Sequence, residues 1–265
     1  MTPRDRVPVC LTIAGSDSGG GAGIQADLKA FARCGAHGAC AITAVTAQNT
    51  TGVELVTPIP APTIVAQVHA VATDIPIDAV KVGMLGDEPT IEAVVEALGL
   101  LGDAPIVVDP VMVSASGATL LDPGAKAALI ERVLPLATVV TPNLPEARQL
   151  AGLGAVAAPE DLARAIQALG PEAVVVTGGH SEDGADVLFD GSGTLRIDGP
   201  RYSGGATHGS GCTHSSALAA FLARGADLAE AARCAREVAS DAVGNGLAGI
   251  GAGAGPVDAL GIIRS

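Results

Sequence analysis

Short apolar runs alternate with longer helical patterns over most of this sequence, and this alternation constrains the fold more than any other feature. An apolar run at residues 9–14 is followed by a helical pattern at 24–36. Further buried-strand patterns lie at 39–46, 79–83, 106–109, 138–141 and 173–177, and further helical patterns lie at 61–74, 87–101, 123–133 and 159–169. Strand–helix alternation of this kind predicts an α/β protein with three layers, α/β/α, around a mostly parallel central sheet.

The pattern changes after residue 177. Residues 185–189 and 194–197 flank a Gly-Ser-Gly turn and predict a β-hairpin. Helical patterns follow at 212–224 and 227–243, and a Gly/Ala-rich stretch from about 244 is expected to be irregular. We find neither an internal repeat nor a domain boundary, so we expect a single domain over residues 1–265.

The composition excludes several classes of protein. The chain of 265 residues has 48% hydrophobic and 16% charged residues, which is typical of a folded protein, and its net charge of -13 argues against binding to nucleic acid or to an anionic membrane. It contains no run of about 18 apolar residues that would predict a membrane span. Its five cysteines form no Cys-x-x-Cys pair, which favours a reducing compartment, and we expect the cytoplasm. An acidic protein can still bind nucleotide phosphates through backbone N–H groups and Mg²⁺.

A glycine-rich segment follows the first predicted strand, at the edge of the sheet where α/β proteins bind ligands. Residues 15–23 contain five glycines, which let the backbone approach a ligand closely. Gly21, Gly23 and Ala26 match the dinucleotide fingerprint G-x-G-x-x-A, but the acidic residue expected about 20 positions later is missing. A plain flexible loop is the other alternative. The chain has no P-loop sequence, G-x-x-x-x-G-K-[ST].

Polar side chains also follow other predicted strands. Thr46 and Gln48 lie at one strand end, where a carboxamide can bind a planar heterocycle through its donor and its acceptor. Turn formation by the neighbouring residues is the alternative explanation for this motif. Asp109 ends another strand and Glu146 follows a third, and the two together suggest a site for Mg²⁺ and a nucleotide. Alternatively, Glu146 only lies in the first turn of a helix, where the helix dipole favours an acid.

The segment Thr-His-Gly-Ser-Gly-Cys-Thr at residues 207–213 is the most informative motif. Its Gly-x-Gly opens a helical pattern, and the free N–H groups at a helix start form an anion-binding site. We expect Cys212 in the first turn of this helix, where the pKa of a thiol is lowered. A Cys–His hydrolase that uses His208 or His214 is one alternative, and a purely structural Cys212 is another.

Seven motifs, ordered over about residues 9 to 225, together resemble the ribokinase-like superfamily and, within it, the hydroxymethylpyrimidine/phosphomethylpyrimidine kinases of thiamine synthesis. They are residues 13–27, 43–50, 81–85, 108–112, 141–146, 178–180 and 208–213. Most members of the wider superfamily carry Asp at the position of Cys212, and a Cys there is similar to the pyrimidine kinases and their pyridoxal-kinase-like relatives. The resemblance implies a ribokinase-like fold and a homodimer.

The resemblance also implies a role for each motif. The residues around the pyrimidine would be Gly15, Asp27, Thr46, Gln48, Met84 and Val111. The residues along the ATP phosphates would be Asn143, Thr177 and Gly179, and Mg²⁺ would be organised by Asp109 and Glu146. The turn formed by Gly209, Ser210, Gly211 and Cys212 would hold the transferring phosphoryl group, and Cys212 would take the proton of the substrate hydroxyl.

The activity implied by the resemblance is ATP-dependent phosphorylation of 4-amino-5-hydroxymethyl-2-methylpyrimidine on its hydroxymethyl group, and then of the monophosphate. A pyridoxal or pyridoxine kinase is the nearest alternative, because those substrates also present a ring-borne CH₂OH. A non-kinase nucleotide-cofactor enzyme and a catalytically silent pyrimidine-binding protein are further alternatives, and the need for a monovalent cation stays open. The chain departs from the family at Thr177, where many members have Lys, at His214, which is usually apolar, and at 251–256, which lacks a usual His.

Overall fold

The centre of the protein is a large sheet whose middle strands are parallel. The computed structural model describes residues 6–114, 116–180, 184–200, 202 and 206–262. In this part of the chain the sheet has nine strands, in the order β3-β2-β1-β4-β5-β6-β7-β8-β9. The strands are β1 (Val9–Asp17), β2 (His37–Gln48), β3 (Val53–Pro58), β4 (Ala79–Val82), β5 (Ile106–Val108), β6 (Val139–Val140), β7 (Ala173–Val176), β8 (Asp186–Phe189) and β9 (Thr194–Ile197). Strands β2, β1, β4, β5, β6 and β7 are parallel, and β3, β8 and β9 are antiparallel at the two edges, which confirms the predicted mostly parallel sheet.

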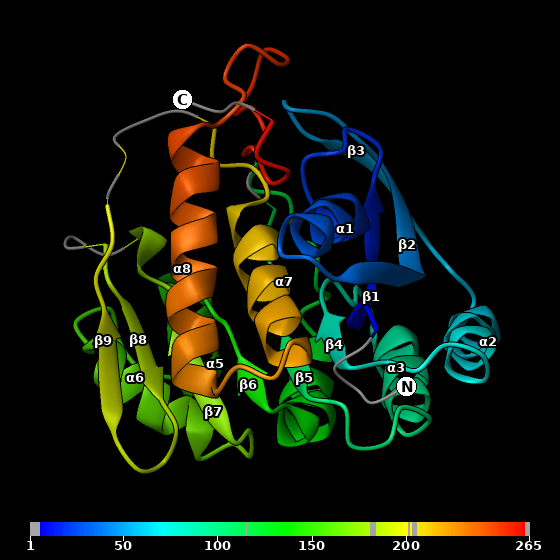
Figure 1. The fold of residues 1–265 in the computed structure, drawn as a ribbon, viewed down its shortest axis with the longest axis horizontal. Helices are drawn as coiled ribbons and strands as arrows, with labels where there is room; N and C mark the ends of the chain where they lie inside the picture. Colours follow the sequence, from blue (N-terminus) through cyan, green and yellow to red (C-terminus); the bar gives the residue numbers. More distant parts are fainter. Residues whose placement is uncertain (1–5, 115, 181–183, 201, 203–205, 263–265) are drawn as a thin grey trace.

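Helices cover both faces of the sheet (Figure 1). The helices are α1 (Gly23–Arg33), α2 (Ala61–Ala72), α3 (Glu88–Leu98), α4 (Ala125–Ala128), α5 (Leu144–Ala151), α6 (Pro159–Gln167), α7 (Ser210–Ala223) and α8 (Leu228–Gly244). Helices α1, α7 and α8 lie together on one face, and α2, α3, α5 and α6 lie on the other (Figure 1).

The alternation of side chains along the parallel strands builds a separate core on each face. Val107 packs into the core beneath α7 with Leu218, whereas the next residue, Val108, packs into the opposite core with Ile91 and Leu162. Successive side chains of a strand point to opposite faces, so a strand covered on both faces must be apolar at every position. This explains why the parallel strands read as continuous apolar runs.

The structure contains two elements that were not predicted from the pattern, and several strands and helices begin or end at other residues than expected. Strand β3 was not predicted, and α5 was considered only as an alternative explanation of Glu146. Strand β1 is longer than expected because it continues pairing with β2 through Ser16 and Asp17 after a bulge, and β2 is longer because it pairs with β1 from His37 and with β3 as far as Gln48. The predicted helix at 123–133 is present, but α4 ends early and the chain continues as a π-helical turn at Leu129–Val133. As expected, residues 245–255 form no helix or strand.

One feature of the topology sets the place of the site. Strand β1 lies between β2 and β4. The next parallel strand along the chain, β2, pairs on one side of β1, and the one after it, β4, pairs on the other side. In open α/β sheets, ligands bind at the carboxyl ends of the strands where the order reverses in this way.

Among the described residues, no helix is long and apolar enough to cross a membrane.

Candidate active site

The glycine-rich segment after β1 lies against the start of α7. Gly209 has φ of 84°, a left-handed conformation that favours glycine, and a side chain there would overlap the carbonyl of Gly21. Gly23 opens α1 with φ of 56°, and a side chain there would overlap the carbonyl of Gly15. These close approaches bring the first turns of α1 and α7 together, although their residues lie far apart in the sequence.

The start of α7 has the properties of an anion site. The helix begins at Ser210, directly after Gly209, and no side chain caps it. The first N–H groups of a helix have no partner within it, and the helix dipole adds partial positive charge there. A Cβ atom on Gly211 would lie 3.8 Å from Asp109 Oδ2, so this helix start lies beside the carboxyl end of β5.

Cys212 is the third residue of α7, in its first turn as predicted, but the predicted lowering of its pKa is wrong. Burial, together with the charges of Asp27 and Asp109, raises the pKa of the Cys212 thiol to about 12, although Lys81 and an N–H from Gly23 act in the opposite direction. The helix start is therefore not the strongest influence on this thiol. Desolvation and two neighbouring carboxylates favour the protonated form.

Asp27 lies below the site in a buried ion pair. Its carboxylate accepts hydrogen bonds from Lys81 Nζ at 2.9 and 3.0 Å, from Thr12 Oγ1 at 2.7 Å and from Ser216 Oγ at 2.8 Å. Both Asp27 and Lys81 are fully buried. Direct contact between Asp27 and a substrate ring stays a prediction, and these four internal bonds argue against it. Sequence reasoning missed Lys81, whose only signal is a lysine inside an otherwise apolar strand.

Apart from Asp27, which lies in α1, the residues predicted to surround a ring lie at the ends of β1, β2, β4 and β5. A Cβ atom on Gly15 would lie 2.7 Å from Met84 Cε, so the Met84 side chain lies directly over the Gly15 backbone. The hydroxyl of Thr43 donates a hydrogen bond to the carbonyl of Met84 at 2.8 Å and holds this segment against β2. Half-buried Val111 follows β5, and Thr46 Oγ1 lies 3.1 Å from the carboxamide of Gln48.

Two buried carboxyl groups, Asp109 and Glu146, lie near one another. Burial, followed by the charge of Asp109, raises the pKa of Glu146 to about 8, and burial raises the pKa of Asp109 although Lys81 opposes it. Glu146 also forms the capping box of α5: its carboxylate accepts the Asn143 N–H at 2.9 Å, and the Asn143 side chain accepts the Glu146 N–H at 3.0 Å. The alternative explanation of Glu146 as a first-turn residue is thus confirmed as its local role.

The carboxyl pair fits a cation that brings most of its own ligands. Two neighbouring buried acids, of which Asp109 raises the pKa of Glu146, gain from a positive charge between them. The described part of the chain has no group of three His, Cys, Asp or Glu side chains that could hold a metal ion alone. Mg²⁺ commonly binds to one or two carboxylates together with water and substrate phosphates. Asp109 and Glu146 fit that pattern.

The three residues predicted to lie along ATP phosphates are adjacent at the ends of β6 and β7. Asn143 and Thr177 form a parallel bridge, and the Thr177 N–H donates to the carbonyl of Pro142 at 2.9 Å. Exposed Gly179 lies in the following 3₁₀ turn, Gly178–His180. Asp186 holds this turn by accepting the Gly178 N–H at 2.7 Å.

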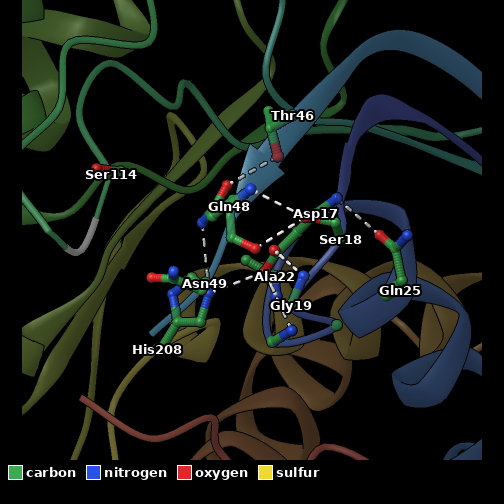
Figure 2. Close-up of polar contacts among 12 residues, drawn as sticks. Asp17, Ser18, Gly19, Ala22, Gln25, Thr46, Gln48, Asn49, Ser114 and His208 are labelled. Carbon is green, nitrogen blue, oxygen red and sulfur yellow. Dashed lines mark hydrogen bonds and ion pairs between the residues drawn. The ribbon is translucent and has the colours of Figure 1, made fainter. Parts of the chain in front are cut away.

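A polar cluster at the end of β1 was only partly anticipated (Figure 2). Its centre is Asp17, a residue of the glycine-rich motif to which no role was given, and it is bonded to His208, which was considered only for a hydrolase. The available signal was the spacing Asp17-Ser18-Gly19, which is typical of an aspartate that caps its own turn. Its partner lies 191 residues away and could not be read from that spacing.

The chain is similar to known proteins along nearly its whole length. The phosphomethylpyrimidine kinase family model matches residues 17–258. The hydroxymethylpyrimidine/phosphomethylpyrimidine kinase of Rhizobium meliloti is 47% identical over 94% of this chain and 96% of its own length, and that of Haemophilus influenzae is 45% identical over 94% and 95%. Among solved structures, pyridoxal kinase from Staphylococcus aureus in complex with ADP superposes with a TM-score of 0.89, at 37% identity over 98% of this chain and 96% of that one. Phosphomethylpyrimidine kinase from Clostridium difficile superposes with a TM-score of 0.79, at 40% identity over 89% and 99%. By both sequence and fold, this chain belongs to the phosphomethylpyrimidine kinase family.

Proposed function

We propose that this protein transfers the γ-phosphoryl group of ATP to the hydroxymethyl group of 4-amino-5-hydroxymethyl-2-methylpyrimidine, and then a second phosphoryl group to the resulting monophosphate. One observation carries the proposal: the uncapped start of α7 lies beside Asp109, so an anion site and a cation site adjoin. Phosphoryl transfer depends on positioning and on neutralising charge around the transferring group, and this pair of sites supplies both.

The chemistry divides among three groups of residues. Gln48 and Met84 bind the pyrimidine ring and direct its hydroxyl toward the start of α7. The hydroxyl gives its proton to Cys212, ionised in the bound state, its oxygen forms a bond to the γ-phosphorus, the bond from that phosphorus to the bridging oxygen breaks, and ADP leaves. The N–H groups of Gly211 and Cys212 bind the charge on the transferring oxygens. Asp109 and Glu146 hold Mg²⁺, which neutralises the phosphate charge when it is bound.

The names of the relatives favour a pyrimidine substrate over pyridoxal. The curated relatives reported above are hydroxymethylpyrimidine/phosphomethylpyrimidine kinases, and they are more similar to this chain than the pyridoxal kinase of Staphylococcus aureus is. Pyridoxal phosphorylation is the second candidate, because that pyridoxal kinase superposes closely along nearly the whole chain. We also propose a homodimer, and the exposed apolar side chains of Val45, Leu55 and Val56 on β2 and β3 support it.

An assay of ADP release tests the proposal directly. Purified protein is given Mg²⁺ and ATP with each of four acceptors: the hydroxymethylpyrimidine, its monophosphate, pyridoxal and pyridoxine. We expect the highest kcat/KM for the pyrimidine, turnover of its monophosphate, and little ADP release without an acceptor. A preference for pyridoxal would favour the second candidate. No acceptor-dependent ADP release with any of the four would contradict a kinase function.

A further inference from the structure

Asp17 is held by donors on every side. Its Oδ1 accepts the Gly19 N–H at 2.8 Å, and its Oδ2 accepts the N–H groups of Gly21 at 3.1 Å and Ala22 at 2.9 Å. His208 Nε2 lies 2.9 Å from the same Oδ2. Although burial alone would raise the pKa of Asp17, the hydrogen bonds from His208 and from the backbone hold it below its usual value. Asp17 is therefore a carboxylate.

The ionisation of Asp17 determines what His208 can do. A carboxylate only accepts hydrogen bonds, so the Nε2 atom of His208 must carry a hydrogen and point it at Asp17. This holds whether or not the other ring nitrogen also carries a hydrogen. His208 is itself buried, and its ring packs against Gly21, where a side chain would overlap it. The one hydrogen on His208 Nε2 points mainly at Asp17, and at 3.5 Å it is shared with Gln48 in a longer three-centre contact, so this side of the ring offers Gln48 a donor and no acceptor.

The other end of the Gln48 carboxamide faces Thr46 (Figure 2). Thr46 Oγ1 lies 3.0 Å from the carbonyl oxygen of Ser16, which can only accept a hydrogen bond, so the hydroxyl hydrogen is used there. Toward Gln48, at 3.1 Å, Thr46 therefore offers a lone pair. Figure 2 draws the Gln48 carboxamide with its oxygen toward Thr46. In that orientation the oxygen faces a lone pair of Thr46, so two acceptors meet. At the other end the NH₂ group faces the N–H of His208, so two donors meet.

Rotating the carboxamide by half a turn satisfies both contacts, since the oxygen and nitrogen of such a group are assigned from their partners. We propose that His208, fixed by Asp17, is a positioning residue that holds the Gln48 oxygen on its own side and the Gln48 NH₂ group on the side of Thr46, and so sets which heterocycle edge the protein accepts. The inference rests on the proposed role of Gln48 as the residue that binds the ring.

A carboxamide held in this way has a defined polarity. One N–H remains free near Thr46, and one oxygen lone pair remains free near His208. A paired ligand edge must then place an acceptor beside Thr46 and a donor beside His208, in the manner in which a glutamine binds the edge of adenine. An exocyclic amino group next to an unprotonated ring nitrogen fits this requirement. The corresponding 4-oxo pyrimidine presents the opposite pattern, a carbonyl next to a ring N–H, and is rejected unless the carboxamide turns.

The test is the ratio of kcat/KM for the 4-amino pyrimidine to that for its 4-oxo counterpart. We expect wild-type protein to prefer the amino compound by about 100-fold, because the wrong edge loses one hydrogen bond and opposes like groups. In His208→Leu the carboxamide loses one of the two contacts that fix its orientation and keeps only the one with Thr46, so turning costs less free energy and the ratio should fall by about tenfold. Ser18→Ala is the matched control, because Ser18 bonds only to the backbone of Gln48, and it should keep the wild-type ratio. An unchanged ratio in folded His208→Leu would overturn the proposal.

Two further measurements cover the cases in which a variant does not fold or turnover is absent. The ¹⁵N chemical shifts of the His208 ring in ligand-free wild-type protein should show a protonated Nε2, and an unprotonated Nε2 would overturn the proposal without any variant. If neither pyrimidine is phosphorylated, the proposed function fails. Calorimetric titration of wild type with the two pyrimidines then still decides the inference: preferential binding of the amino compound supports it, and equal binding overturns it.

Discussion

The thiol of Cys212 is subject to opposing influences. Lys81 and the N–H of Gly23 favour the thiolate, whereas burial and the carboxylates of Asp27 and Asp109 favour the thiol, and the second set is stronger. In the ligand-free protein Cys212 is therefore protonated near neutral pH and is not ready to accept a proton. A cation bound close to Asp109 would cancel the effect of the Asp109 charge on the pKa of Cys212, because a bound cation reverses the local effect of a carboxylate. A role for Cys212 as proton acceptor consequently depends on bound Mg²⁺ and ATP.

Alkylation of Cys212 checks this protonation state. In ligand-free protein without Mg²⁺, the rate of modification by iodoacetamide should be low at pH 7.5 and should rise with pH up to at least pH 10 without levelling off, because only the thiolate reacts and its pKa is raised to about 12. Mass spectrometry of the peptide that contains Cys212 measures the rate, and N-acetylcysteine serves as the reference thiol. A rate that levels off between pH 7 and 8.5 would show that the helix start outweighs burial.

Single residues also show where prediction from sequence ends. Thr46 and Gln48 were placed at the sheet edge because they end or follow an apolar run, and strand ends can be located from such runs, whereas Met84 was assigned by resemblance alone. The partners of buried charges cannot be located in this way. The Asp27–Lys81 pair joins residues that are 54 positions apart, and only the fold brings them together.

At the scale of secondary structure, the predictable elements are those whose own apolar pattern defines them. The parallel strands are mostly continuous apolar runs, and α3 follows the predicted pattern and begins at Glu88, directly after the N-cap Asp87, whose side chain accepts the Thr90 N–H. Strand β3 has no buried position and exists through pairing with β2, so no pattern within Val53–Pro58 reveals it. Helix α5 has only 8 residues, too few for a clear helical period, although Asn143 and Glu146 form its capping box.

The cap of α5 should affect both stability and nucleotide binding. Asn143→Ala removes the acceptor for the Glu146 N–H, and the free energy of unfolding should fall by about 1 kcal/mol. Asp227→Ala at the start of α8 is a matched control, because Asp227 caps the Glu230 N–H in the same way. Denaturant unfolding should show a similar loss for both variants. Only Asn143→Ala should raise KM for ATP, and an unchanged KM would remove Asn143 from the nucleotide site.

For the molecule as a whole, the stability of the fold and the chemistry of the site are in conflict at one place. The two cores on either side of the sheet are built from apolar side chains, yet the carboxyl edge of the sheet also buries Asp109 and Glu146. Burying acids costs free energy unless they are paired or protonated. The ligand-free protein therefore bears the free-energy cost of burying Asp109 and Glu146, and we expect bound Mg²⁺ and ATP to reduce that cost.

The pH dependence of unfolding tests this conflict. The pKa of Glu146 is raised from 4.5 in the unfolded chain to about 8 in the folded protein, so between about pH 4.5 and 8 the folded state binds more protons than the unfolded state. The contribution of Glu146 to the free energy of unfolding is then complete below pH 4.5 and is lost as the pH rises through about 8. The Tm of wild-type protein without Mg²⁺ should fall between pH 5 and 8 more steeply than that of Glu146→Gln, whose side chain stays neutral and can still accept the Asn143 N–H. Titrating groups away from this carboxyl pair are present in both proteins and cancel in the difference. Parallel Tm curves for the two proteins would mean that Glu146 is already ionised in the folded state, and that the site stores no such penalty.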